Sequence, residues 1–234
     1  MSHFDFKQFR IHHDRCAMKV GTDGVLLGAW ANVKDNENIL DIGTGTGLIA
    51  LMLAQRANAH ITGVEIDPEA AAQATQNVSE SPFSQQVRIV NTDIKDYPYE
   101  PKYDNIVSNP PFFKESVLPP KDSRATARHC AGLPPETLVE EAKKRLRANG
   151  LFQVILPHSE VSRFVGLCAL KEMSLLRLTE ICTKEGKPFK RALLCFINQI
   201  EATGTTRDIL YLAGPDGGRS AGYQALTKDF YLEK

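Results

Sequence analysis

A strand, a glycine-rich turn and a helix follow one another in the first quarter of the chain, and this order constrains the fold more than any other feature. The apolar run 38–42 is typical of a buried strand, and the amphipathic run 48–57 is typical of a helix. Three glycines at alternate positions separate them: Gly43, Gly45 and Gly47. Such glycines let the backbone pass close to a ligand at a helix N-terminus, so the pattern predicts an α/β protein with a ligand here.

The glycine spacing argues against a dinucleotide as that ligand. A dinucleotide fingerprint would need its third glycine at position 48, where this chain has Leu48. Glycines at alternate positions after Asp41 instead suit S-adenosylmethionine.

Two further strand-like runs each end at an acidic residue. The run 60–64 ends at Glu65, about 20 residues beyond the glycine turn, where a carboxylate can accept both ribose hydroxyls. The run 87–92 ends at Asp93. Because the carboxyl ends of parallel strands meet at one edge of a sheet, we expect these acids and Asp41 to bind hydroxyl, amine and adenine donors there.

A motif rich in hydrogen-bond acceptors, Asn109-Pro110-Pro111-Phe112, follows the strand-like run 103–108. The two prolines fix successive φ angles and remove both backbone donors. The Asn109 side-chain oxygen and the Pro110 carbonyl can each accept one hydrogen of a planar amino group, and Phe112 can stack on a flat ring. Taken alone, the motif could equally be a rigid turn that closes a strand.

Together, the glycine turn, the two acidic strand ends and the Asn-Pro-Pro-Phe motif resemble those of the class I S-adenosylmethionine-dependent methyltransferases over residues 38–157. The Asn-Pro-Pro-aromatic variant is similar to enzymes that methylate planar exocyclic nitrogens. The resemblance implies S-adenosylmethionine as methyl donor, S-adenosylhomocysteine as product, and no metal. It implies catalytic roles for Asn109, Pro110 and Phe112. The cofactor-binding residues that it implies are Gly21, Thr22, Asp41, Gly43, Gly45, Gly47, Glu65, Asp93 and Asn109.

The segment 19–30 narrows the resemblance. It is similar to the N-terminal signature of bacterial tRNA methyltransferases that modify N6 of adenine 37 in the anticodon loop of a valine tRNA. In that family the segment lies beside the methionine end of the cofactor, so Gly21, Thr22 and Asp23 are candidates by position. The segment also reads as a helix capped by Thr22 or Asp23, and the two interpretations are compatible.

Other functions remain as alternatives. The target could be another planar amine: an rRNA base, a DNA adenine or a protein glutamine. Residues 1–37 are too few for the large helical N-terminal domain of the glutamine enzymes, and little room is left for a DNA target-recognition region. A nicotinamide-dependent oxidoreductase is disfavoured by Leu48. A non-catalytic RNA-binding protein would have no need of the cofactor turn or of Asn109.

Charge is balanced, with 28 Lys and Arg against 28 Asp and Glu, so a tRNA would have to bind through local basic patches. Two basic groups flank the expected site: Lys114, Lys121, Arg124, Arg128 and His129, and Arg10, His12, His13, Arg15 and Lys19. The expected substrate-binding residues are Pro111, Lys19, Lys114, Arg124, Arg128 and His129. Solvated surface charge is the alternative, and a third basic group, 143–147, could simply complement a helix end.

The remaining pattern alternates between helices and strands. We expect helices at 68–79, 134–146 and 159–173, a strand at 151–156, and a hairpin of 175–182 with 191–200. A short strand at 209–212 and a helix from Ser220 complete the chain. The predicted fold is a doubly wound, mostly parallel sheet with an antiparallel hairpin at one edge.

Length and composition favour one globular domain. The resemblance implies that residues 38–234 form its methyltransferase domain and that residues 1–37 form an N-terminal extension. Five cysteines without a CxxC pair indicate neither a disulfide framework nor a zinc site, which favours a cytoplasmic location. No signal peptide is evident, and no apolar run approaches the roughly 18 residues of a membrane span. We expect a monomer without an obligate protein partner.

Overall fold

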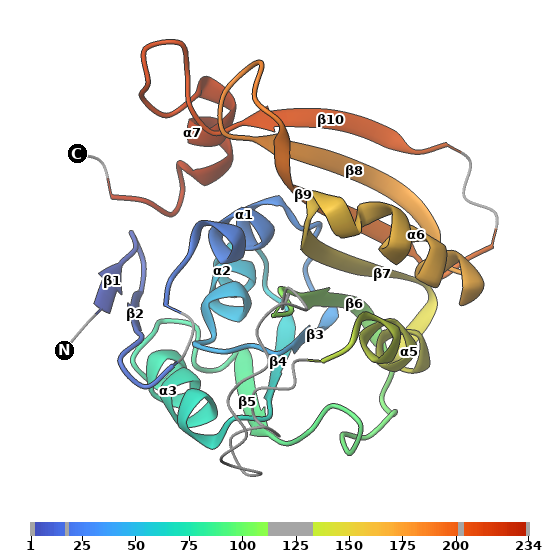
Figure 1. Ribbon diagram of the computed structural model, residues 1–234. Coiled ribbons are helices and arrows are strands. Elements are labelled where there is room, and N and C mark those ends of the chain that lie inside the picture. Colours follow the sequence, from blue (N-terminus) through green and yellow to red (C-terminus); the bar gives the residue numbers. More distant parts are fainter. Residues whose placement is uncertain (1–2, 17–18, 112–132, 201–203, 233–234) are drawn as a thin grey trace, which may run out of the picture.

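The computed structural model describes residues 3–16, 19–111, 133–200 and 204–232. Its centre is an eight-stranded sheet in the order β10-β8-β9-β7-β6-β3-β4-β5, with helices on both faces (Figure 1). The strands are β3 (Asn38–Ile42), β4 (His60–Glu65), β5 (Val87–Asn91), β6 (Tyr103–Ser108), β7 (Leu146–Pro157), β8 (Ser174–Cys182), β9 (Phe189–Ile197) and β10 (Thr206–Tyr211).

The strand directions confirm the predicted fold class. Within this sheet β9 runs antiparallel to its neighbours β7 and β8, and every other adjacent pair is parallel. The hairpin β8–β9 therefore adds an antiparallel part to a parallel sheet. β10 pairs with β8 outside the hairpin and forms the sheet edge.

The helices agree with the predicted positions to within a few residues. They are α1 (Thr22–Trp30), α2 (Leu48–Arg56), α3 (Pro68–Ser79), α5 (Pro135–Arg145), the short η1 (His158–Glu160), α6 (Val161–Leu170) and α7 (Ala221–Thr227). α3 spans the residues predicted for it, because Asp67 accepts hydrogen bonds from two backbone N–H groups of the first turn and Pro68 starts the helix. None of the helices in the described ranges is long and apolar enough to cross a membrane.

Two apolar cores hold the helices to the sheet. α1 and α2 pack on one face with Ile39 and Ile61, whereas α5 and α6 pack on the other with Leu40 and Val64. Successive residues of β3 thus face opposite cores, as the alternation of a strand requires. Burial on both faces explains why these strands read as continuous apolar runs.

The N-terminal residues form a separate two-stranded antiparallel sheet, β1 (His3–Asp5) with β2 (Arg10–His12). Phe6 and Ile11 belong to the same apolar core as α1 and α2. Phe6 also forms a bridge with Tyr231, so the two ends of the chain lie side by side (Figure 1).

Candidate active site

The carboxyl ends of β3, β4, β5 and β6 bring the predicted polar residues to one edge of the sheet. β3 lies between β4 and β6, so the glycine turn that follows β3 lies between Glu65 and Asn109. Neighbouring strands are about 4.8 Å apart, which separates the ends of β4 and β6 by about 10 Å. A ligand can lie across the turn between them.

The glycine turn has a backbone that other residues rarely adopt. Gly43, Gly45 and Gly47 have φ angles of 72°, 56° and 79°, all in the left-handed region. The N–H groups of Gly43 and Thr44 donate to the Val64 carbonyl at 2.9 and 3.1 Å, which fixes the turn to β4. A Cβ added at Gly43 or Gly45 would meet no atom within 4 Å. Bare backbone therefore borders open space, an arrangement that fits a bound cofactor.

Glu65 supports this turn with its carboxylate. Its Oε2 accepts from the Gly45 N–H at 2.9 Å, and its Oε1 accepts from the Asp67 N–H at 3.0 Å. Each oxygen keeps a second lone pair, so the group can still accept hydroxyl hydrogens from a ligand.

Asp41, by contrast, is enclosed by the protein. Its side chain is fully buried, and its Oδ2 accepts from the Thr44 hydroxyl at 2.6 Å. Burial raises the pKa of Asp41 to about 7, and the negative charge of Glu65 acts in the same direction against the hydrogen bond from Thr44. The structure thus places Asp41 beneath the turn, as a support for Thr44.

This raised pKa predicts a pH-dependent stability. The folded-state pKa lies above that of the unfolded chain, so the stabilising proton is held below pH 7 and lost as the pH rises through about 7. As the pH rises from about 6 to about 8, deprotonation of Asp41 should lower the free energy of unfolding by about 1 to 2 kcal/mol. Asp41→Asn should lack this component. Urea unfolding of both proteins at both pH values measures it, and equal pH responses would contradict the prediction.

Asp93 and Ile66 lie at the neighbouring strand ends. Asp93 accepts from the Lys95 N–H at 3.0 Å and pairs with the Lys95 ammonium at 3.1 Å. Ile66, directly after Glu65, is 49% exposed, which is high for a large apolar side chain. Sequence reasoning missed Ile66, although an apolar residue directly after a strand-end acid was visible as a signal.

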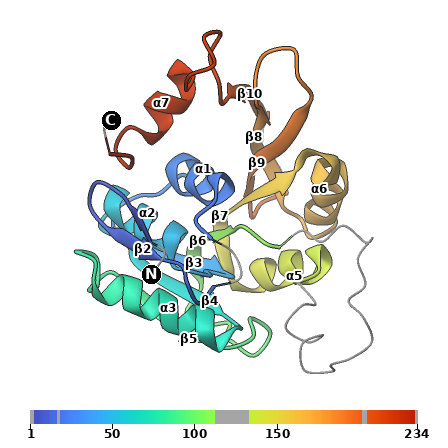
Figure 2. The ribbon, with the colours of Figure 1, turned by 60° about the vertical axis from the view of Figure 1, so that its left-hand side comes forward.

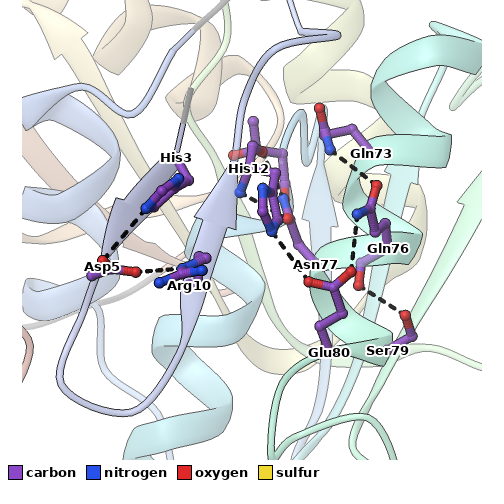
Figure 3. Close-up of polar contacts among 10 residues, drawn as sticks. His3, Asp5, Arg10, His12, Gln73, Gln76, Asn77, Ser79 and Glu80 are labelled. Carbon is purple, nitrogen blue, oxygen red and sulfur yellow. Dashed lines mark hydrogen bonds and ion pairs between the residues drawn. The ribbon is translucent and has the colours of Figure 1, made fainter. Parts of the chain in front are cut away.

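Asn77 of α3 connects the turn to β2. Its fully buried amide accepts from the His12 N–H and donates to the carbonyls of His12 and Thr46, each at 2.9 Å (Figure 3). Sequence reasoning missed this residue. The available signal was a polar side chain one turn after Ala74, within the buried face of an alanine-rich helix.

The predicted cap of α1 is wrong. Gly21 is the N-cap residue, and no side chain caps the helix. The Asp23 carboxylate instead accepts a hydrogen bond from the Arg191 guanidinium of β9 at 2.7 Å. This charge-assisted contact holds the carboxylate away from the helix N-terminus. α1 also lies very close to α2, since a Cβ at Gly28 would come within 2.7 Å of Met52 Sδ.

The Asn-Pro-Pro-Phe motif follows β6 as predicted. Asn109 is half-buried, Pro110 is buried and Pro111 is exposed. The Ser108 hydroxyl donates to the Ile42 carbonyl at 2.8 Å and so ties the start of the motif to β3. Outside the described residues lie Phe112, Lys114, Lys121, Arg124, Arg128 and His129, whose roles stay predictions.

Several of the other basic residues are engaged within the protein. Arg10 pairs with Asp5 at 2.5 Å, and His12 contacts Glu80 at 3.2 Å (Figure 3). Arg145 of the third basic group is fully buried and donates to Glu141 and to two backbone carbonyls, so it is structural. Lys19 is exposed. Among the described residues, no cluster of His, Cys, Asp or Glu could hold a metal ion.

Comparisons with known proteins cover nearly the whole chain. The family model of the methyltransferase small domain matches residues 19–173. A tRNA1(Val) (adenine(37)-N6)-methyltransferase of Photorhabdus laumondii is 44% identical over 233 residues, which is 98% of this chain and 95% of that protein. The protein of the same name from Bacteroides fragilis is 46% identical over 233 residues, or 98% of each chain.

Solved structures share the fold. A predicted O-methyltransferase from Agrobacterium tumefaciens has a TM-score of 0.69, with 89% of this chain and 96% of that chain covered at 16% identity. A methyltransferase from Pyrococcus furiosus has a TM-score of 0.53, with 72% and 78% covered at 24% identity.

Proposed function

We propose that this chain, which belongs to the family of tRNA1(Val) (adenine(37)-N6)-methyltransferases, methylates N6 of adenine 37 in a valine tRNA. The observation that carries the proposal is the glycine turn lying between Glu65 and Asn109 at one sheet edge. S-adenosylmethionine, when bound, supplies a methyl group on a positively charged sulfonium and leaves as S-adenosylhomocysteine. A tRNA substrate puts the reaction in the cytoplasm, and we take a single chain to be sufficient.

Different residues around the turn contact different parts of the cofactor. Glu65 accepts the two ribose hydroxyls with the lone pairs that its backbone contacts leave free. The exposed Ile66 covers one face of the adenine ring, and Asp93 accepts from the adenine amine. The start of α1, Gly21 with Thr22, borders the methionine end. Asp41 acts through Thr44, by holding the turn in shape.

Asn109 and Pro110 hold the target amine. The exocyclic nitrogen of adenine is a weak nucleophile, because its lone pair is delocalised into the ring. Hydrogen bonds to the Asn109 side-chain oxygen and the Pro110 carbonyl turn that lone pair toward the methyl group. Such positioning can remove several kcal/mol of barrier without a strong base. Before the reaction, the base must leave its stack to reach the site. After methyl transfer, the nitrogen loses its extra proton to water or to a nearby acceptor.

Tritium transfer from S-adenosylmethionine to unmodified tRNA tests the proposed function. Label should enter valine tRNA and be recovered as N6-methyladenosine at position 37. The same tRNA with guanine at position 37 should stay unlabelled, since it lacks the target amine. Label in another tRNA, or at another position, would overturn the proposed substrate.

A further inference from the structure

The turn between β8 and β9, residues 183–188, lies at the same edge of the sheet as Asn109. Because β9 runs antiparallel to β7, its first residues lie beside the last residues of β7. In the strand register, Arg191 of β9 thus lies opposite Pro157 of β7 on one side and opposite Ile181 of β8 on the other. β7 in turn is the neighbour of β6. Two strand spacings, about 10 Å, separate β9 from β6 across the sheet, and the base of the turn lies about two residues beyond the level of Asn109.

Three lysines on and beside this turn form what we term the lysine arm: Lys184, Lys187 and Lys190. All three are exposed, and none of them forms an ion pair with a residue in the described part of the chain. Two arginines of the same hairpin differ, because Arg191 of β9 forms an ion pair with Asp23 and Arg177 of β8 forms one with Asp208. The turn also carries one exposed carboxylate, Glu185, so three ammonium groups against one carboxylate leave it with a net positive charge at the edge that carries the active site.

The turn itself is well ordered by internal contacts. The Lys187 N–H donates to the Lys184 carbonyl at 3.1 Å, and Gly186 has a φ of 76°. A glycine with positive φ before the closing residue is the pattern of a type II turn. The buried Cys182 thiol lies 2.8 and 2.9 Å from the carbonyl oxygens of Lys184 and Lys187. These contacts hold the backbone of the turn, which Figure 2 shows as the loop that joins β8 and β9, while the three lysine side chains are exposed.

The base of the turn is also fastened to the cofactor side of the molecule. Arg191, directly after Lys190, donates to Asp23 in the first turn of α1 at 2.7 Å. α1 lies against α2, whose N-terminus is the glycine turn. The lysine arm therefore keeps a fixed position relative to the glycine turn.

From this arrangement we propose that the lysine arm binds backbone phosphates of the tRNA next to the adenine held at Asn109. The proposal rests on the proposed function. Ammonium groups are strong phosphate partners, and phosphate contacts set the register of a nucleic acid without reading its sequence. An adenine drawn into the site brings the phosphates of its neighbours to within about 10 to 20 Å of Asn109, where these side chains lie. With no net charge, the protein needs such a local patch.

The test replaces Lys184, Lys187 and Lys190 together by alanine and follows binding of unmodified valine tRNA as salt is varied. Each lost phosphate contact lowers the log–log salt slope by about 0.7 to 0.9, so the slope should fall by about 2. Near physiological salt, the KM for tRNA should rise about tenfold or more. The kcat at saturating tRNA and the affinity for S-adenosylmethionine should not change, because phosphate contacts bind ground and transition states alike.

A matched control removes the same charge elsewhere, by replacing Lys34, Lys171 and Lys228 with alanine. All three are exposed. Lys34 precedes β3 at the opposite edge of the sheet, and Lys171 follows α6. Lys228 adjoins Asp229, whose carbonyl accepts from Gln55 near the end of α2, far from the glycine turn. This control should keep the salt slope and the KM of the wild type.

The outcomes separate the two proposals. If the wild type methylates valine tRNA while the lysine-arm variant keeps its salt slope and KM, the lysine arm is not a phosphate site. Equal losses in both triple variants would overturn it too, because the effect would then be one of total charge. Failure of the wild type to methylate valine tRNA would overturn the proposed function instead. Unchanged S-adenosylmethionine affinity in the variants shows that they are folded.

Discussion

Replacing Asn109 by alanine is expected to lower kcat for adenine methylation by about two to three orders of magnitude, the usual cost of losing one well-placed transition-state contact. The variant keeps the Pro110 carbonyl, but the amine then has one acceptor and can rotate away from the methyl group. The affinity for S-adenosylmethionine should change by no more than about twofold, because we assign Asn109 chiefly to the acceptor nitrogen. Single-turnover kinetics with calorimetry of cofactor binding measures both quantities.

Asn58→Ala is the matched control for this prediction. Asn58 is exposed and precedes β4, at the opposite edge of the sheet. It should keep both kcat and cofactor affinity. A loss of S-adenosylmethionine binding in Asn109→Ala that equals the loss of turnover would show that Asn109 serves the cofactor instead of the target amine.

Replacing Glu65 by alanine is expected to weaken S-adenosylmethionine binding by about 2 to 5 kcal/mol, which is about 30-fold or more in Kd. Two charge-assisted hydrogen bonds to the ribose would be lost. The N–H groups of Gly45 and Asp67 would also lose their acceptor, so the turn itself would be less well fixed. Calorimetric titration with S-adenosylmethionine measures the effect.

Two further variants sharpen this experiment. Glu65→Gln retains one carbonyl acceptor but turns an NH2 group toward one of its donors, so its affinity should lie between those of wild type and alanine. Glu69→Ala removes an exposed negative charge from the first turn of α3 and should bind normally. Wild-type affinity in Glu65→Ala would assign the ribose to another acid, with Asp67 the nearest candidate.

Much of the sheet edge was predictable because its signals are local. Each strand from β3 to β6 is a short strand-like run with apolar residues near its carboxyl end, and the polar residue that marks this end stands within two positions of it in the sequence. Parallel pairing then places Glu65 and Asn109 on either side of the glycine turn without further information.

Other features depend on contacts between distant segments and carry no local signal. From the sequence, Asp23 is a candidate helix cap. Its actual partner, Arg191 of β9, stands 168 residues later in the chain. Arg10 reads as free positive charge, although the hairpin β1–β2 returns it to Asp5. Asp41 reads as one more strand-end acid, yet its complete burial follows from the packing around it.

The contacts between residues 6–7 and residues 230–231 affect when the fold is completed during synthesis. β2, which Asn77 joins to the glycine turn, belongs to a hairpin whose Phe6 bridges Tyr231 and whose Lys7 N–H donates to the Phe230 carbonyl. These partners stand more than two hundred residues apart in the sequence, so the ribosome makes the central sheet between them. The hairpin is therefore translated before the strands of the central sheet but gains these partners only after them, so the support that it gives to the glycine turn through Asn77 is completed only once those partners have been made.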